Sequence, residues 1–166
     1  MIYLVIPCYN EQEVLEDSTK KLASLIGRMQ GEDMRILFSD DGSRDETWNI
    51  ICKLHHQYPF VEGIRLAHNE GHQKALWAGM EAAADRAEAI ISIDADLQDD
   101  IEVIPRMVAD FRQGADVVYG VRKERDTDSA FKRLTALTFY RLMNTLGSHL
   151  VYNHADFRLL SRRALL

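Results

Sequence analysis

The sequence lacks the features of several protein classes. No run of apolar residues approaches the ~20 that a membrane-spanning helix needs. The N-terminus has no basic-then-apolar signal pattern, because Met1 leads directly into an apolar run typical of a buried strand. The only two cysteines, Cys8 and Cys52, lie in different expected elements and form no Cys-x-x-Cys or Cys/His ligand spacing. We therefore predict two core thiols in a reducing compartment rather than a disulfide or a zinc site.

Several catalytic motifs are absent as well. The chain has neither the Gly-x-Gly-x-x-Gly pattern of dinucleotide folds nor the Gly-x-x-x-x-Gly-Lys-Ser/Thr pattern of P-loops. No Gly-x-Ser-x-Gly and no Cys/His pair indicates nucleophilic hydrolysis. A nucleotidyltransferase would need a glycine-rich, basic loop after the first strand, and the segment from Pro7 to Glu11 has neither property.

The charge is unevenly distributed along the 166 residues, which suffice for one domain with its own core. Residues 1–121 carry 11 Lys and Arg against 22 Asp and Glu, whereas residues 122–166 carry 9 against 4. A basic end on an acidic protein indicates an anionic partner, such as a phosphate or a membrane surface. On charge alone, a solvated helical face explains the same pattern equally well.

Short apolar runs alternate with helical patterns along the first 121 residues. The periodicity predicts strands at 2–7, 35–39, 60–66, 89–93 and 116–121, and helices at 14–29, 45–54, 73–84 and 101–113. Ser43 and Glu46 have the spacing of a capping box for the second helix, and Pro105 is tolerable in the first turn of the fourth. Such alternation predicts an α/β fold, a mostly parallel Rossmann-like sheet with helices on both faces.

The chain changes character near residue 122. Residues 122–129 are polar, and residues 131–146 form the pattern of an amphipathic helix with basic residues beside its apolar face. We predict a single domain, 1–166, in two parts, residues 1–121 and residues 122–166.

Polar residues follow each of the first four predicted strands. In open α/β sheets, ligands bind beyond the carboxyl ends of the strands, so these four segments are expected to meet at one site. They are Pro7 to Glu11, Asp40 to Ser43, His68 to His72, and Asp94 to Asp100.

Asp94 and Asp96 form the most informative of these segments. Two carboxylates at i and i+2 directly after a buried strand can converge on one hard cation, and Mg2+ or Mn2+ commonly takes one or two carboxylates together with substrate phosphate oxygens. The alternative is that both merely end the strand and cap the next helix. Asp99 and Asp100 are available for that capping, so we favour a metal site.

The other segments each allow a ligand role and a structural one. Asp40 and Asp41 suit a turn and helix cap, but one aspartate suffices for that, which leaves the other for a nucleobase edge or ribose. Tyr9 suits stacking on a base or a half-buried packing position. Gly71 lets the backbone approach a ligand closely. Lys74 suits a phosphate contact or an ordinary surface position.

Taken in order, these residues resemble the inverting family 2 glycosyltransferases, which have a GT-A fold. The segments that carry the likeness are Ile6 to Glu11, Ser39 to Ser43, and Asp94 to Asp96. The chain is still more similar to the polyprenyl-phosphate branch, the bactoprenol glucosyltransferases and dolichyl-phosphate mannose synthases. That closer likeness lies in residues 69–76, 96–99, 119–122 and 156–160, so the resemblance covers essentially the whole chain.

The resemblance implies roles for individual residues. The nucleoside would be held by Pro7, Tyr9, Glu11, Ser39 and Asp41. Asp94 and Asp96 would hold Mg2+ or Mn2+ on the donor diphosphate, and Gln98 and Arg122 would line the sugar-phosphate site. Ala95 and Lys74 are also expected to contact the nucleotide sugar. Residues 1–121 would thus be the nucleotide-sugar-binding part and residues 122–166 the acceptor-side part. Asp96 and Asp156 would be the catalytic residues, Asp156 at the position of the catalytic base. Arg122 and Arg158 would bind the acceptor phosphate.

One step of this scheme stays open on chemical grounds. A phosphomonoester has a second pKa near ~6, so a polyprenyl phosphate is mostly a dianion at neutral pH and needs little proton abstraction. With that acceptor, Asp156 would instead orient the sugar or Arg158, or stabilise developing positive charge. A sugar hydroxyl would need a base.

The expected activity is therefore inverting transfer from a nucleotide sugar, UDP-glucose-like rather than GDP-mannose, to a polyprenyl phosphate. The rival readings are a family 2 enzyme that extends a surface polysaccharide and a catalytically dead nucleotide-sugar-binding module. Members of this branch usually continue into interfacial and transmembrane helices, so we interpret the chain as a fragment of a longer protein at the cytoplasmic face of a membrane. No nucleic-acid partner is expected, and a homo-oligomer is left open.

Overall fold

The computed structural model describes residues 1–121 and 154–165. The elements in chain order are β1 (Ile2–Cys8), α1 (Leu15–Arg28), β2 (Met34–Asp40), α2 (Thr47–Gln57), β3 (Val61–Arg65), α3 (His72–Ala84), β4 (Ala89–Ser92), the 3-10 helix η1 (Ile101–Val103), α4 (Ile104–Arg112), β5 (Val117–Val121), β6 (His154–Ser161) and α6 (Arg162–Leu165). Contacts divide the chain into one unit of Met1–Tyr119 with Asp156–Leu166 and a second of Gly120–Ala155. The first unit contains the residues considered below.

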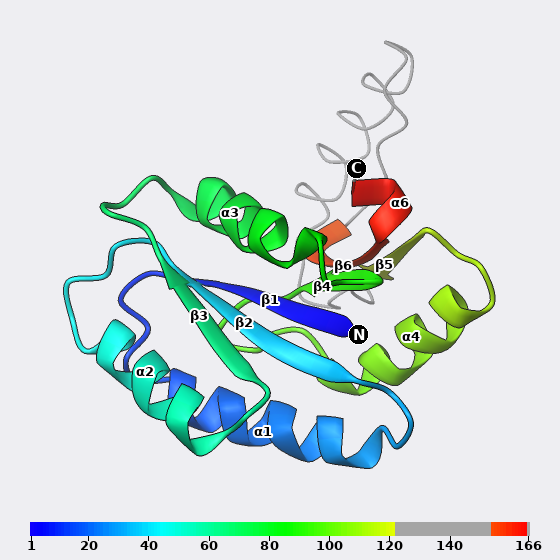
Figure 1. The fold of residues 1–166 in the computed structure, drawn as a ribbon, viewed down its shortest axis with the longest axis horizontal. Coiled ribbons are helices and arrows are strands. Elements are labelled where there is room, and N and C mark those ends of the chain that lie inside the picture. Colours follow the sequence, from blue (N-terminus) through cyan, green and yellow to red (C-terminus); the bar gives the residue numbers. More distant parts are fainter. Residues whose placement is uncertain (122–153, 166) are drawn as a thin grey trace, which may run out of the picture. The chain divides into compact units, whose positions relative to one another are not determined.

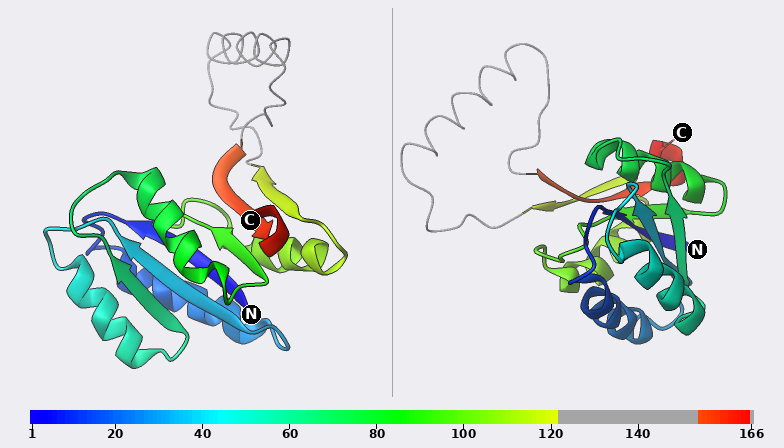
Figure 2. Two further views of the ribbon diagram at one scale, coloured as in Figure 1. Left: turned by 45° about the horizontal axis from the view of Figure 1, so that its top comes forward. Right: turned by 90° about the vertical axis from the view of Figure 1, so that its left-hand side faces the viewer.

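The strands form one sheet in the order β3-β2-β1-β4-β6-β5. The β1 strand pairs in parallel with β2 and β4, and β2 pairs in parallel with β3. Helices α1, α2 and α4 cover one face of the sheet, and α3 covers the other (Figures 1 and 2). The predicted α/β fold with helices on both faces is thus confirmed.

The core lies around β1, in which every residue is buried. Because β1 is central and covered on both faces, it reads as a continuous apolar run rather than an alternating one. Gly79 lets α3 pack closely against it, since a Cβ at that position would lie 2.6 Å from Val5 Cγ1. Both cysteines are free thiols; Cys8 is buried in the core, as predicted, whereas Cys52 is only half-buried.

The sequence analysis does not predict β6, which runs antiparallel to β4. Its signal is a period of two: Phe157 and Leu159 are buried, whereas Arg158 and Leu160, which alternate with them, are partly exposed. The β6 strand brings residues from the C-terminal end of the chain into the same sheet as β1 and β4.

Two predicted helix starts can be compared with the structure. The capping box is wrong: α2 begins at Thr47, and the Ser43 hydroxyl donates to Asp40 instead of capping the helix. Asp45 Oδ1 accepts from the Thr47 backbone N–H at 3.0 Å. Pro105 does lie in the first turn of α4, as predicted, after one turn of 3-10 helix.

The second predicted region lies largely outside the described residues. This applies to the polar segment 122–129, the amphipathic helix 131–146 and Arg122. Among the residues that are described, no helix is both long enough and apolar enough to cross a bilayer.

Glu62, on the outer strand β3, forms hydrogen bonds with residues of β1, β2 and the segment after α3. These contacts are expected to make the stability of the protein depend on pH. Glu62, 19% exposed, accepts from Tyr3 Oη at 3.1 Å, Arg35 Nη1 at 3.2 Å and Arg86 Nη2 at 2.8 Å. Burial raises the pKa of Glu62, but the hydrogen bonds from Arg86 and Tyr3 and the charge of Arg86 outweigh it and lower the pKa below its usual value.

We expect the contribution of Glu62 to be present above the unfolded-state pKa of about 4.3 and lost as the pH falls through the lower folded-state value. Replacing Glu62 by Gln should therefore lower the free energy of unfolding at pH 7 by about 1–2 kcal/mol. The difference between variant and wild type should shrink in urea titrations below pH 4. A difference that stays constant from pH 7 to pH 3 would contradict this assignment.

Candidate functional site

The carboxyl ends of β1, β2 and β3 point to the same edge of the sheet, on the left in Figure 1. The β4 strand is parallel to β1 and ends at the same edge. The four polar segments identified in the sequence follow these four strands. The structure therefore brings them to one edge, as the topology predicts.

The loops after β1 and β2 are joined by reciprocal hydrogen bonds. The backbone N–H of Asn10 donates to Ser43 Oγ at 2.9 Å, and the Asn10 side-chain oxygen accepts from the N–H of Arg44 at 2.9 Å. The N–H of Glu11 donates to Thr47 Oγ1 at 2.8 Å. Because each loop satisfies backbone groups of the other, the two form one preorganised wall of the site.

The loops after β2 and β3 are joined by Asp41. Its carboxylate, on a residue 1% exposed, accepts from the N–H groups of Glu70 at 2.7 Å and Gly71 at 2.8 Å. Gly42 adjoins the same loop so closely that a Cβ would lie 2.7 Å from the His68 carbonyl carbon. Gly42 also has a φ of 67°, a left-handed conformation that glycine adopts without strain.

Asp40 is fully buried, and its side chain stabilises the turn that follows β2. Its Oδ1 accepts from both the N–H and the hydroxyl of Ser43, and Arg65 Nε lies 3.1 Å from its Oδ2 as the charged partner. That last contact is an ion pair without hydrogen-bond alignment. Both aspartates of the pair thus bind protein groups, and the predicted nucleoside contact of Asp41 stays a prediction.

Pro7 and Ser39 lie near the carboxyl ends of β1 and β2, shortly before these loops. They are register partners on β1 and β2, and both are buried. The Ser39 hydroxyl donates to the Ala75 carbonyl at 2.6 Å and so fixes the first turns of α3 on the sheet. Their predicted contacts with a nucleoside are untested by this geometry.

Other predicted residues are open to solvent at the same edge. Tyr9 is 40% exposed, as a stacking residue would have to be. Lys74 extends from the first turn of α3 and pairs with Glu70. The paired charges raise the pKa of Lys74, first through the hydrogen bond from Lys74 to Glu70.

The turn after β4 presents Asp94 and Asp96. The N–H of Leu97 donates to the Asp94 carbonyl at 3.1 Å, and Leu97 has a φ of 50°, so the chain reverses tightly here. Gln98 donates to Asp96 through its backbone N–H at 3.2 Å and its side-chain amide at 2.7 Å. His72, the first residue of α3, places Nε2 3.7 Å from Asp94 Oδ1.

These residues fit a divalent cation by their chemistry. Asp94 is half-buried and Asp96 exposed, and both are hard oxygen donors. Burial raises the pKa of Glu11, and the negative charges of Asp96, Asp45 and Asp94 raise it further, which shows an excess of negative charge at this edge. Within the described residues, no three His, Cys, Asp or Glu side chains form a complete metal cluster. At sites of this kind, waters and substrate phosphates commonly supply the remaining ligands of Mg2+.

Sequence reasoning missed one residue that touches this turn. The hydroxyl of Ser18, on α1, donates to the Ala95 carbonyl at 2.6 Å. A serine inside the apolar stripe of an amphipathic helix is the only sequence signal for such a contact, and it is a weak one.

The β6 strand carries two further predicted site residues, Asp156 and Arg158. Arg158 pairs in register with Ser92, the last residue of β4, and accepts a hydrogen bond from its hydroxyl at 3.4 Å through the backbone carbonyl. Arg158 Nε is buried and finds no hydrogen-bond partner among the described residues. Because β6 runs antiparallel to β4, the backbone of Asp156 lies toward the edge where Asp94 follows β4.

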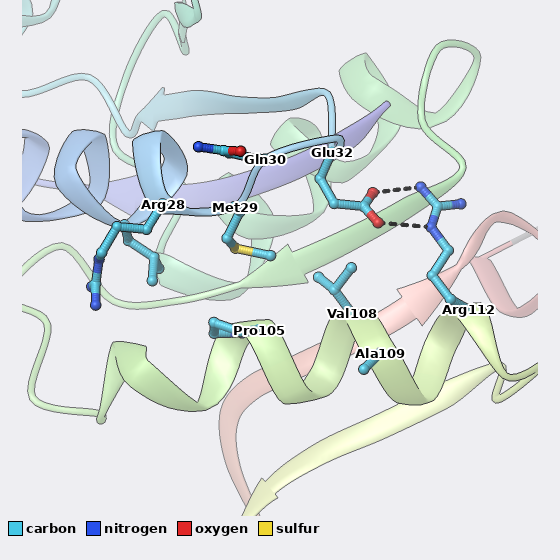
Figure 3. Close-up of a pocket in the computed structure, with 9 residues that line it drawn as sticks. Arg28, Met29, Gln30, Glu32, Pro105, Val108, Ala109 and Arg112 are labelled. Atoms are coloured by element: carbon cyan, nitrogen blue, oxygen red, sulfur yellow. Dashed lines mark hydrogen bonds and ion pairs between the residues drawn. The ribbon is translucent and has the colours of Figure 1, made fainter.

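Two cavities of about 420 Å³ lie away from this edge. One lies between the end of α1 and α4, where Pro105 and Val108 point toward Met29 and an ion pair joins Glu32 to Arg112 (Figure 3). The other lies between α2 and β3, beside Trp48 and Glu62.

Comparison with known proteins gives a consistent result. The family model described as Glycosyl transferase family 2 matches residues 3–166. An uncharacterized glycosyltransferase of Bacillus subtilis, YkoT, is 49% identical over 99% of the chain and 50% of its own length. The prophage bactoprenol glucosyl transferase homolog of Escherichia coli is 40% identical over 97% of the chain and 52% of its own length. The chain thus spans about half the length of the curated relatives it matches.

Solved structures agree on the fold. Glucosyl-3-phosphoglycerate synthase of Mycobacterium tuberculosis, in complex with Mn2+, UDP-glucose and phosphoglyceric acid, superposes with a TM-score of 0.67 over 98% of this chain and 57% of that one, at 19% identity. At this level of identity the likeness concerns the fold, which is the GT-A type.

Proposed function

Because this chain belongs to glycosyl transferase family 2, we propose that it transfers a sugar from a nucleotide sugar to a polyprenyl phosphate, with inversion at the sugar carbon. The product would be a glycosyl-phosphoryl-polyprenol, and the donor UDP-glucose. The name of the Escherichia coli relative supports the acceptor and the glucosyl group. The observation that carries the proposal is the meeting of the four polar segments, with Asp94 and Asp96, at one edge of the sheet.

The donor would bind along this edge. Tyr9 is exposed enough to stack on the base, and Pro7 and Ser39 would support the nucleoside from the ends of β1 and β2. Asp41 would contribute in two ways, by holding the 68–71 loop and by facing the base. Lys74 would exchange its ion pair with Glu70 for a diphosphate oxygen, which exposed pairs allow at low cost.

Asp94 and Asp96 would hold Mg2+ or Mn2+, with Ala95 between them and Gln98 orienting Asp96. When bound, the cation would neutralise charge on the nucleoside diphosphate as the glycosidic C–O bond breaks. Inversion requires a single attack from the face opposite the diphosphate, so the protein needs no carboxylate nucleophile.

Arg158 would receive the acceptor phosphate. Its buried and unpartnered Nε is the kind of donor that an anion satisfies, and a guanidinium matches phosphate oxygens in pairs. Because the acceptor phosphate is already a dianion, Asp156 would orient the sugar or Arg158 rather than remove a proton. Arg122 would bind the acceptor phosphate together with Arg158. A membrane-borne lipid phosphate implies action at a membrane surface.

A thermal-shift panel of nucleotide sugars tests the donor half of the proposal. The melting temperature should rise with UDP-glucose in Mn2+ by more than with GDP-mannose, and the rise should disappear in EDTA, because ligands that bind only the folded state stabilise it. Equal shifts with every nucleotide, or none, would argue against a UDP-sugar site.

Replacing Arg158 by Ala tests the acceptor half. We expect transfer to a polyprenyl phosphate to fall by about tenfold or more, because a charge-assisted contact to the acceptor is lost. UDP affinity by calorimetry should stay within about twofold, since Arg158 is assigned to the acceptor alone. Arg162→Ala is the matched control, because Arg162 is exposed and lies 3.9 Å from Asp85.

The assay requires a chain of the relatives' full length and the lipid in vesicles. Transfer onto a soluble oligosaccharide that is unaffected by Arg158→Ala would instead favour an enzyme that extends a polysaccharide.

A further inference from the structure

Ser18 is a polar residue in the buried stripe of α1. It is 4% exposed and lies among Leu15, Leu22 and Leu25, which pack on the sheet from the same helix face. Its hydroxyl donates a hydrogen bond to the Ala95 carbonyl at 2.6 Å, and the two residues are 77 positions apart in the sequence. A buried hydroxyl costs stability unless it is hydrogen-bonded, so this contact accounts for the presence of a serine here.

The accepting carbonyl lies at a sensitive place. Ala95 is itself 4% exposed and separates Asp94 from Asp96. Rotation of the peptide that follows Ala95 would change the directions in which the two carboxylates point. The same turn is closed on the other side by the hydrogen bond from the Leu97 N–H to the Asp94 carbonyl.

We propose that Ser18 is a positioning residue for the divalent-cation site, acting through the Ala95 carbonyl. The inference rests on the proposed function, because it assumes that Asp94 and Asp96 hold a cation. Removal of the hydroxyl leaves the buried Ala95 carbonyl without this hydrogen-bond donor. We expect the turn to shift so that the carbonyl finds another donor. The carboxylates then meet the cation in poorer geometry, which weakens its binding, and Mg2+ in particular demands near-ideal octahedral geometry.

Thr19 supplies a matched control on the same helix. It is 0% exposed, and its hydroxyl donates to the Leu15 carbonyl at 2.7 Å, within α1. Thr19→Val therefore removes a buried hydroxyl without touching the turn after β4. Any general weakening of α1 appears in both variants, whereas an effect on the cation site appears only in Ser18→Ala.

The experiment measures the dissociation constant of UDP by calorimetry, in Mn2+ and in EDTA, at a temperature where all variants are folded. For Ser18→Ala we expect affinity in Mn2+ to fall about fivefold, as loss of one hydrogen bond implies, with no change in EDTA. Thr19→Val should match wild type in both conditions. Ser18→Cys keeps a weaker donor at nearly the same place and should give an intermediate value, which also covers the case in which Ser18→Ala does not fold.

The outcomes separate the two levels of inference. If wild type binds UDP more tightly in Mn2+ and Ser18→Ala does so to the same extent, the role of Ser18 is overturned and the metal site stands. An equal loss in Mn2+ and EDTA, or an equal loss in Thr19→Val, also overturns it, because the effect would then be structural. If wild type shows no dependence on Mn2+, the proposed function fails and this inference fails with it.

Discussion

Replacing Asp96 by Asn is expected to weaken UDP binding in Mn2+ by about tenfold or more while leaving the fold intact. The substitution keeps the size of the side chain and removes the negative charge, and hard divalent cations depend on charged oxygen ligands. Asp96 is exposed, so its replacement leaves no buried group unsatisfied. Calorimetry with UDP in Mn2+ and in EDTA measures the effect, with the melting temperature as the check on folding.

Asp100→Asn is the matched control for this experiment. Asp100 is an exposed aspartate in the same segment, and its side chain caps η1 by accepting from the Glu102 N–H at 3.0 Å. Asparagine caps helices as well as aspartate does, so this variant should bind UDP like wild type. Wild-type affinity that is the same in EDTA and in Mn2+, or an Asp96→Asn variant that binds UDP in Mn2+ as tightly as wild type, would contradict the metal assignment.

Replacing Gly42 by Ala is expected to have the largest effect on the site as a whole. A Cβ there would lie 2.7 Å from the His68 carbonyl carbon and 2.8 Å from its Cα, which are backbone atoms that cannot rotate away. The φ of 67° adds the strain of a left-handed conformation for alanine. We expect the free energy of unfolding to fall by about 3 kcal/mol. UDP affinity should fall roughly tenfold or more, because the loops after β2 and β3 are forced apart.

Gly31→Ala separates strain from crowding. Gly31 also has a positive φ, 90°, but a Cβ there would have no atom within 4 Å. Its replacement should cost only the conformational strain, about 1 kcal/mol, and should leave UDP affinity unchanged. If Gly42→Ala melts like Gly31→Ala and binds UDP normally, the tight joining of the two loops does not matter for the site.

The repeating pattern of strands and helices was predictable because each buried strand forms a short apolar run and each helix an amphipathic period. The edge where the polar segments meet followed from the parallel topology alone. The β6 strand was missed, although Phe157 and Leu159 alternate with polar or partly exposed neighbours. An eight-residue strand that pairs across 66 residues of sequence with Ser92 depends on a long-range contact that no local pattern encodes.

Which polar side chains hold the loops together and which remain available for a ligand was less predictable from the sequence. The sequence shows that Asp40 and Asp41 adjoin a turn, but not that the carboxylate of Asp41 binds the N–H groups of Glu70 and Gly71. Which backbone groups need a partner depends on how two loops approach each other in three dimensions. The same holds for Ser18, whose hydrogen-bond acceptor is the Ala95 carbonyl in the turn after β4. Side chains that serve as ligands and side chains that hold the loops are of the same residue types, so composition cannot tell them apart.

Analysis of the reaction products tests the central claim most directly. A chain of the relatives' full length is incubated with UDP-glucose labelled in the sugar, a polyprenyl phosphate in vesicles and Mn2+. The extracted products are identified by mass spectrometry, and their anomeric configuration is determined by NMR. The account predicts UDP and a glucosyl-phosphoryl-polyprenol of inverted anomeric configuration, formed in equal amounts and abolished by Asp96→Asn. Release of pyrophosphate, a product of retained configuration, or label found only on an oligosaccharide would contradict it.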